Sequence, residues 1–176
     1  TKRIGILGAM PEEINEIVSL LQNKQEVVKG MRSYYTGTIN NIEVVIVFSR
    51  WGKVASATTV THLIIEFAIT HLYFTGVAGA VNQDLNIGDV IIASSLVQHD
   101  MDARPIMKQF EIPLLGKIEF CPPDDIIEKS IERIREAIYD DNFLCKFTSE
   151  QKKMFSISNP KVLVGQIASG DKFFSN

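Results

Sequence analysis

The stretch that decides the fold is RIGILGAMPEEI, residues 3–14. Residues 3–8 are mostly apolar and predict a short buried strand. Pro11 then has the fixed φ that suits the first turn of a helix, which we expect to continue to about Leu21. A strand, a short loop and a helix are typical of α/β proteins, in which ligands gather at the carboxyl ends of the strands. The loop at residues 8–13 therefore lies where chemistry is expected.

Glu12 and Glu13 open this helix and are predicted to point in different directions. Side chains three, four and seven residues apart share one face of a helix. Glu16 and Ser19, four and seven residues after Glu12, share its face and are polar. Glu13 is expected to turn inward, because it borders the apolar stripe of the helix: Ile14, Ile17, Val18 and Leu21. On spacing alone, both remain typical first-turn carboxylates that complement the helix dipole.

The rest of the chain alternates predicted strands and helices. A hairpin is expected at 34–39 and 42–49, because Asn40-Asn41 tolerates a left-handed turn. The other expected elements are a helix at 54–67 that buries Val60, Leu63, Ile64 and Phe67, strands at 71–76 and 87–95, a helix at 125–139, a polar bend at 148–153 and a strand at 162–170. This order predicts one α/β domain, residues 1–176, with a mixed and mostly buried sheet.

Four loops follow predicted strands or precede predicted helices and are expected to meet in one pocket: GAMPEE (8–13), SRWGK (49–53), TGVAGA (75–80) and SGDKFF (169–174). Gly76 and Gly79 allow the backbone to approach a phosphate, ribose or base closely, or simply form a tight turn. Phe173 and Phe174 suit stacking on a planar heterocycle, although paired phenylalanines are also typical of a core.

Composition limits the class of partner. A net charge of -3 and a pI near 5.6 argue against nucleic acid or acidic lipid, and favour a small molecule or a protein. Cys121 and Cys145 lack the spacing of a metal site and the density of a disulfide scaffold, so we expect buried or idle thiols in a reducing compartment. Because no apolar run approaches membrane-spanning length, we expect a cytoplasmic protein without a membrane partner.

Residues 98–105, QHDMDARP, gather His99, Asp100, Asp102 and Arg104. The segment lacks a second histidine and a recurrent ligand spacing, so we expect no metal there and favour a hydrogen-bonded loop or a subunit contact. His62 and His71 are each expected to be structural.

Several segments in this order and spacing resemble the methylthioadenosine/S-adenosylhomocysteine nucleosidases of the purine nucleoside phosphorylase-like superfamily: GILGAMPEEI (5–14), WGKVASA (51–57), FTGVAGAV (74–81), NIGDVIIAS (86–94) and SGDKFF. The likeness covers essentially the whole chain. It implies a three-layer α/β/α sandwich that acts as a homodimer without cofactor or metal. It also implies hydrolysis of the N-glycosidic bond of 5′-methylthioadenosine and S-adenosylhomocysteine to adenine and a thioribose.

The resemblance places the glutamate that activates the attacking water at Glu13, the residue that the helix pattern turns inward. The other implied assignments are Met10 near the ribose and the water, Trp51 and Gly79 at the pocket border, Phe173 and Phe174 on either side of adenine, and His99 with Asp100 in a loop that closes the alkylthio end of the neighbouring subunit's site.

The sequence also departs from the family pattern. In the family, SGDxF is followed by a Glu-Met-Glu segment that binds the ribose hydroxyls and by a Ser-Asp pair whose aspartate protonates N7. The chain ends at Asn176, so we expect a domain truncated at its C-terminal end, with exposed sheet edges at 71–76 and 162–170 and little activity. Asp171 matches the SGDxF aspartate and is assigned a structural role, and Val77 stands where many members have serine.

Two alternatives to the hydrolase remain open. One is a nucleoside phosphorylase, or a hydrolase of a related nucleoside, within the same superfamily. Phosphorolysis requires an anion site, for which Arg50 is the one candidate in the relevant loops. The other is a nucleoside-binding or dimerising remnant without activity, which the missing acid favours.

Overall fold

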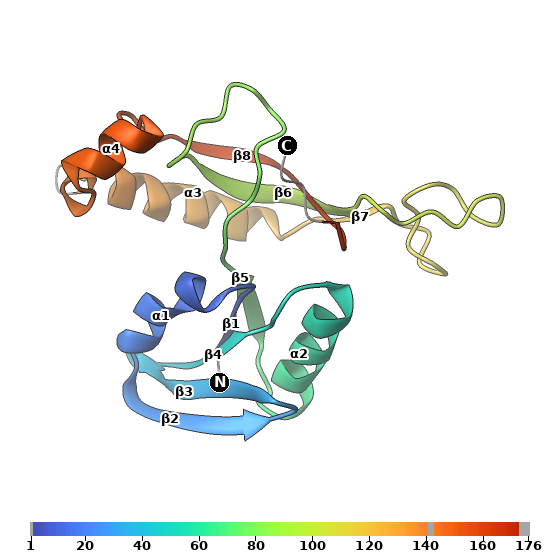
Figure 1. Cartoon of the computed structure of the whole chain (residues 1–176). Coiled ribbons are helices and arrows are strands. Elements are labelled where there is room, and N and C mark those ends of the chain that lie inside the picture. Colours follow the sequence, from blue (N-terminus) through green and yellow to red (C-terminus); the bar gives the residue numbers. More distant parts are fainter. Residues whose placement is uncertain (1, 141–142, 173–176) are drawn as a thin grey trace. The chain divides into compact units, whose positions relative to one another are not determined.

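The computed structural model describes residues 2–140 and 143–172, which form two compact units (Figure 1). Unit 1 contains residues 2–78 together with 171 and 172, and unit 2 contains the described residues of 79–170. Each unit is built on its own hydrogen-bonded sheet.

Unit 1 is built on a mixed five-stranded sheet in the order β2-β3-β4-β1-β5. Its strands are β1 (Arg3–Gly8), β2 (Gln22–Lys29), β3 (Arg32–Ile39), β4 (Ile42–Phe48) and β5 (His71–Phe74). β1 runs parallel to β4 and β5, whereas β3 runs antiparallel to β2 and β4. Asn40 and Asn41 have φ values of 49° and 62°, which confirms the predicted left-handed turn of the hairpin.

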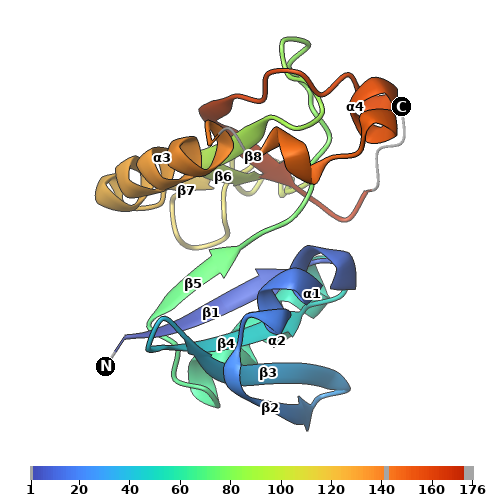
Figure 2. The same ribbon diagram turned by 90° about the vertical axis from the view of Figure 1, so that its left-hand side faces the viewer.

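Two helices cover the sheet of unit 1: α1 (Pro11–Ser19) and α2 (Lys53–Ile65). Both faces of the sheet must be covered, because successive side chains of a strand such as β4 point to opposite faces. Val44 and Ile46 pack in a cluster with residues of α1, and Val45 and Val47 pack in another with Leu63 of α2. Unit 1 therefore has a helix, sheet and helix arrangement, which the two views show from different sides (Figures 1 and 2).

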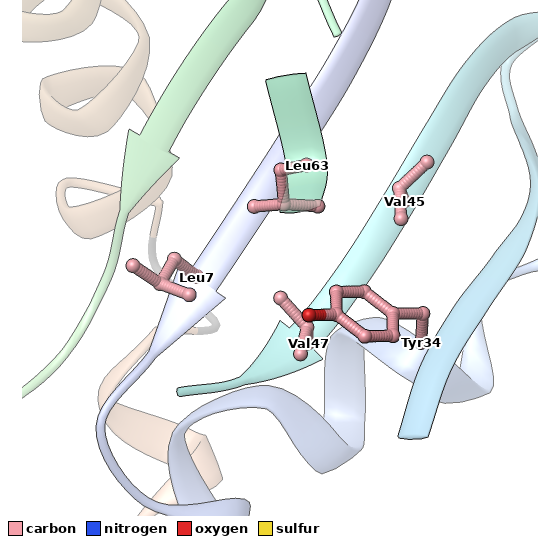
Figure 3. Close-up of a cluster of buried hydrophobic side chains, with 5 residues drawn as sticks. All are labelled: Leu7, Tyr34, Val45, Val47 and Leu63. Carbon is pink, nitrogen blue, oxygen red and sulfur yellow. The ribbon is translucent and has the colours of Figure 1, made fainter. Parts of the chain in front are cut away.

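The cluster on the α2 side consists of Leu7, Tyr34, Val45, Val47 and Leu63 (Figure 3). The expectation that Ile64 shares this burial is wrong, because its side chain is 55% exposed. Thr59 and Leu63, four residues apart on one helix face, are both fully buried and lie at the centre of the packed stripe. Ile64 is one position further round the helix and points away from the sheet.

Unit 2 contains a three-stranded sheet in the order β7-β6-β8. Its elements are β6 (Val90–Gln98), β7 (Glu119–Phe120), α3 (Asp124–Ile138), a 3-10 turn η1 (Leu144–Lys146), α4 (Ser149–Phe155) and β8 (Val162–Ser169). β6 and β8 are parallel, and α3 packs against both strands. The sheet orders leave β5 and β8 as edge strands of their sheets, as expected.

Three further features of the structure differ from what the sequence predicted. Residues 148–153 form the start of α4 rather than a bend, because Thr148 and Gln151 complete a capping box: the Gln151 N–H donates to Thr148 Oγ1 at 3.1 Å and the Thr148 N–H to Gln151 Oε1 at 2.8 Å. β2 was not predicted, since its residues are mostly polar and exposed. Cys121 and Cys145 are exposed, so burial, one of the two alternatives expected for these thiols, is wrong.

Within residues 2–140 and 143–172, no helix combines the length and the apolar character that crossing a membrane requires.

Leu63→Ala should lower the free energy of unfolding by about 2 to 5 kcal/mol, because it leaves a cavity under α2. The matched control is Ile64→Ala on the same helix, which removes an exposed side chain and should have a small effect. Urea unfolding followed by circular dichroism measures both. Equal losses for the two variants would contradict the packing described for α2.

Candidate functional site

The site is organised at the carboxyl edge of the parallel strands of unit 1, where three of the predicted loops begin. The Ser49 N–H donates to the Gly8 carbonyl oxygen at 2.9 Å, and the Thr75 N–H donates to the Leu7 carbonyl oxygen at 2.9 Å. These bonds extend the pairing of β1 with β4 and β5 to the last residues of the strands. The segments that follow β1, β4 and β5 therefore leave the sheet side by side.

Glu13 joins two of these loops. Its Oε2 accepts hydrogen bonds from the backbone N–H groups of Ala9 and Met10 at 2.6 and 3.0 Å. Its Oε1 accepts a bond from the Val77 N–H at 3.0 Å, which reaches it from the loop after β5. Glu13 is half-buried whereas Glu12 is exposed, so the predicted orientation of the two glutamates is confirmed.

The bonds of Glu13 show that its structural and chemical interpretations are compatible. The bond from the Met10 N–H is the arm of a capping box in which the third helical residue reaches back to the cap. An ionised carboxylate has about four acceptor positions on its two oxygens. The three backbone bonds leave acceptor capacity on Oε1, enough to hold a water molecule and to take its proton.

Gly8 and Gly76 lie where an added Cβ atom would collide with residues of the first turn of α1. A Cβ atom on Gly76 would lie 2.8 Å from Glu13 Oε1, closer than real Cβ contacts come. A Cβ atom on Gly8 would lie 2.6 Å from Ile14 Cγ2 and 3.3 Å from the Glu13 Cβ. The sequence suggested that the backbone at Gly76 approaches a ligand or forms a tight turn, whereas the neighbour that the structure shows at Gly76 is the Glu13 side chain.

Trp51 lies in the loop after β4 and is 76% exposed. Gly52, which follows it, has a φ of 91° and precedes the first residue of α2. The Lys53 N–H donates to Asp171 Oδ1 at 2.8 Å, and Lys53 Nζ lies 3.5 Å from Asp171 Oδ2. This contact agrees with the structural role assigned to Asp171, and it brings Asp171 to the SRWGK loop.

The other predicted substrate contacts are less closely defined. Met10 is half-buried and is the residue before the first turn of α1. Gly79 is in unit 2, and a Cβ atom built on it would meet nothing within 4 Å. Phe173 and Phe174 lie outside the described residues.

His99 and Asp100 follow β6 in unit 2 and contact the segment after β8. The His99 N–H donates to the Ser169 carbonyl oxygen at 3.0 Å, and a Cβ atom on Gly170 would overlap the His99 ring and lie 3.0 Å from Asp100 Cγ. Further along the loop, Asp102 accepts hydrogen bonds from Arg104, which lower the pKa of this carboxyl to about 2. The loop is thus hydrogen-bonded, as one of the two expectations stated.

Neither remaining histidine lies in the group formed around Glu13. Tyr34 is fully buried, and its hydroxyl shares a 3.0 Å hydrogen bond with His62 Nδ1; burial raises the pKa of Tyr34. His71 Nδ1 lies 2.9 Å from Thr70 Oγ1. In the part of the chain that the structure describes, no three His, Cys, Asp or Glu side chains are placed to hold a metal ion. An open hollow on α3 is lined by none of the predicted site residues.

Comparison with known proteins identifies relatives of this chain. The chain is 34% identical to the aminodeoxyfutalosine nucleosidase of Helicobacter pylori, over 98% of this chain and 66% of that protein. It is 42% identical to the 5′-methylthioadenosine/S-adenosylhomocysteine nucleosidase of Desulfotalea psychrophila, over 97% and 64% respectively.

Solved structures give the same result. The nucleosidase of Colwellia psychrerythraea in complex with adenine superposes with a TM-score of 0.82 at 26% identity, over 98% of this chain and 64% of that one. The chain thus spans about two thirds of the length of the relatives it matches. The predicted nucleoside phosphorylase-like α/β fold is confirmed. The family model described as "Phosphorylase superfamily" matches residues 3–176, and the chain belongs to this family.

Proposed function

We propose that this protein hydrolyses the N-glycosidic bond of 5′-methylthioadenosine and S-adenosylhomocysteine, releasing adenine and a thioribose. The single observation that carries the proposal is the Glu13 carboxylate, fixed by three backbone N–H groups at the carboxyl edge of the sheet with acceptor capacity left on Oε1. The names of the relatives support the reaction class, since those compared above are nucleosidases.

In the proposed reaction the C1′–N9 bond breaks, and its electron pair leaves with adenine. Water attacks C1′ of the oxocarbenium-like ribosyl group and gives its proton to Glu13. Adenine takes up a proton from a leaving-group acid, which the family places in a segment after SGDxF. Met10 directly precedes α1 and its N–H donates to Glu13 Oε2 at 3.0 Å, which suits the proposed position near the ribose and the water.

The names of the relatives leave the natural substrate open between the two thio-nucleosides and aminodeoxyfutalosine. We also propose that the chain forms a single domain, works as a homodimer with the His99–Asp100 loop at the neighbouring site, and acts in the cytoplasm. Phe173 and Phe174 are proposed to flank adenine, and Trp51 and Gly79 to border the pocket.

Arg50 is the one arginine in the loops relevant to the phosphorylase alternative. Its Nη2 donates to the Met31 carbonyl oxygen at 2.6 Å, which uses one of the five N–H donors of its guanidinium. Replacing phosphate-free buffer with phosphate tests this alternative directly. Adenine release from 5′-methylthioadenosine that requires phosphate, with 5-methylthioribose 1-phosphate as the second product, would identify a phosphorylase instead.

Glu13→Gln should reduce adenine release from 5′-methylthioadenosine by about two to four powers of ten, because an amide cannot take the proton from water. Chromatography of the products in phosphate-free buffer measures the rate. Glu12→Gln is the matched control, since it changes the neighbouring exposed glutamate and should keep the wild-type rate. Equal rates for wild type and Glu13→Gln would refute the assignment of Glu13. A folded wild type without any release would support the inactive remnant.

Gly76→Ala should lower activity even though it removes no carboxylate from the chain. The added methyl group would displace the Glu13 carboxylate from the Val77 N–H and from the water it holds. We expect a loss of about tenfold or more in kcat, measured by the same assay. Gly165→Ala is the control, because its Cβ would have an ordinary 3.8 Å contact with Ile91. An active Gly76→Ala variant would show that the position of the carboxylate is not critical.

A further inference from the structure

Trp51, the only tryptophan of the sequence, lies between two residues with left-handed backbone angles. Arg50 has a φ of 71° and Gly52 has a φ of 91°. Glycine adopts this region freely, whereas in arginine it brings the Cβ atom close to the following carbonyl oxygen. Residues 51 and 52 form a bend that leaves the indole 76% exposed. The loop after β4 thus presents a large apolar ring to solvent through a backbone conformation that is unfavourable at Arg50.

Two hydrogen bonds hold Arg50 in this conformation. Its Nη2 donates to the carbonyl oxygen of Met31, 19 residues earlier in the chain, at 2.6 Å. Its own carbonyl oxygen accepts a bond from Ser49 Oγ at 2.7 Å, and the Ser49 side chain is only 1% exposed. A left-handed residue other than glycine persists where its surroundings over-determine it, and such residues gather at functional sites. The conformation of Arg50 is therefore fixed from both its side chain and its backbone.

The carbonyl oxygen that Arg50 binds belongs to the tight turn between β2 and β3. Gly30 and Met31 form this turn with φ values of 53° and 60°, which are typical of a two-residue hairpin. Arg32, the first residue of β3, donates through Nη1 to the Gly30 carbonyl oxygen at 2.9 Å. Because β3 runs antiparallel to β4, its first residues lie beside the end of β4. Arg50 thus ties the loop after β4 to a turn that the sheet itself holds.

The same loop starts beside the residues that hold Glu13. The Ser49 N–H donates to the Gly8 carbonyl oxygen at 2.9 Å, and the N–H of the next residue, Ala9, binds Glu13 Oε2 at 2.6 Å. Trp51 is two residues after Ser49, a span that covers at most about 7 Å. An exposed indole this close to the carboxyl edge of the sheet offers a flat apolar surface to a nucleoside bound at Glu13.

We propose that Arg50 is a positioning residue for nucleoside binding. Its bond to the Met31 carbonyl oxygen keeps the backbone at Arg50 left-handed, and this conformation holds the Trp51 ring where it contacts the nucleoside. The role rests on the proposed function, because it assumes that Trp51 borders the pocket. Arg50 itself takes no part in bond breaking, and this role differs from the phosphate binding that the phosphorylase alternative would require of it.

Three variants and one control test the role. Arg50→Ala removes the guanidinium, whereas Arg50→Lys keeps a charged donor on a side chain of similar length. Ser49→Ala removes the hydroxyl that binds the Arg50 carbonyl oxygen, so it loosens the same loop from its buried side. The matched control is Arg133→Ala, which removes another exposed arginine with a 2.9 Å hydrogen bond, to Glu136. Arg133 lies on α3, which contains none of the proposed site residues.

The experiment combines kinetics with the fluorescence of Trp51, which reports on this loop alone because the sequence contains no other tryptophan. Adenine release in phosphate-free buffer gives KM and kcat for 5′-methylthioadenosine, and equilibrium dialysis gives the Kd of adenine. Adenine should change the Trp51 emission of the wild type.

Arg50→Ala should raise KM and the adenine Kd by about five- to tenfold, the size expected from losing one exposed hydrogen bond, with a smaller change in kcat. It should also reduce the effect of saturating adenine on the Trp51 emission. Ser49→Ala should shift both constants in the same direction. Arg50→Lys should stay within about twofold of wild type, and Arg133→Ala should match wild type.

The possible outcomes separate this role from the proposed function. Wild-type constants in a folded Arg50→Ala, equal losses in Arg133→Ala, or adenine binding that leaves the Trp51 emission of the wild type unchanged would overturn the positioning role and leave the nucleosidase intact. A loss in Arg50→Ala that appears only when phosphate is present would assign Arg50 to phosphate binding instead. Should Arg50→Ala fail to fold, wild-type constants in Ser49→Ala would overturn the role. A folded wild-type protein that neither binds adenine nor releases it would overturn the proposed function, and the positioning role with it.

Discussion

The arrangement of the candidate site depends on one carboxylate that receives three backbone N–H groups. The Ala9 and Met10 N–H groups lie where the chain leaves β1 and enters α1, so neither has a partner within the strand or the helix. The Val77 N–H lies beyond the end of β5 and is in the same situation. Glu13 satisfies all three, and the geometry of both loops therefore depends on a single side chain.

This dependence accounts for the glycines around the carboxylate. A side chain bonded on both oxygens can move aside for a methyl group only by breaking these bonds, so the undisturbed arrangement needs a residue without a Cβ atom at Gly76. The same reasoning applies at Gly170, where His99 and Asp100 occupy the space of a side chain. Each of these two glycines is thus explained by the side chains that lie against it rather than by an unusual backbone angle.

Much of the fold could be predicted because its signals are local. Apolar runs gave β1, β4, β5, β6 and β8, and the Asn40-Asn41 pair gave the hairpin with its turn. β2 could not be found in this way, since its pairing with β3 comes from the backbone while its side chains stay exposed. α4 was missed for a different reason: its capping signal was present at Thr148 and Gln151, but the helix is short and buries no residue.

Prediction of the candidate site from the sequence has the same limit. Helical spacing was enough to turn Glu13 inward, because that direction depends only on its neighbours in α1. The bond to Val77 and the bond between Lys53 and Asp171 depend on which strands lie side by side, and no local pattern contains that information. Sequence reasoning thus identified the carboxylate but not the partners that hold it.

The structural and catalytic interpretations of Glu13 were set against each other at the level of sequence, but the geometry removes the conflict. A general base must be held in one position relative to the water it activates, and capping its own helix provides that restraint. The cost is that the residue cannot be replaced for chemistry alone: in a glutamine the amide NH₂ would face at least one backbone N–H donor. If Glu13 is the general base that we propose, stability and activity are coupled at this one side chain, whereas Glu12 is exposed.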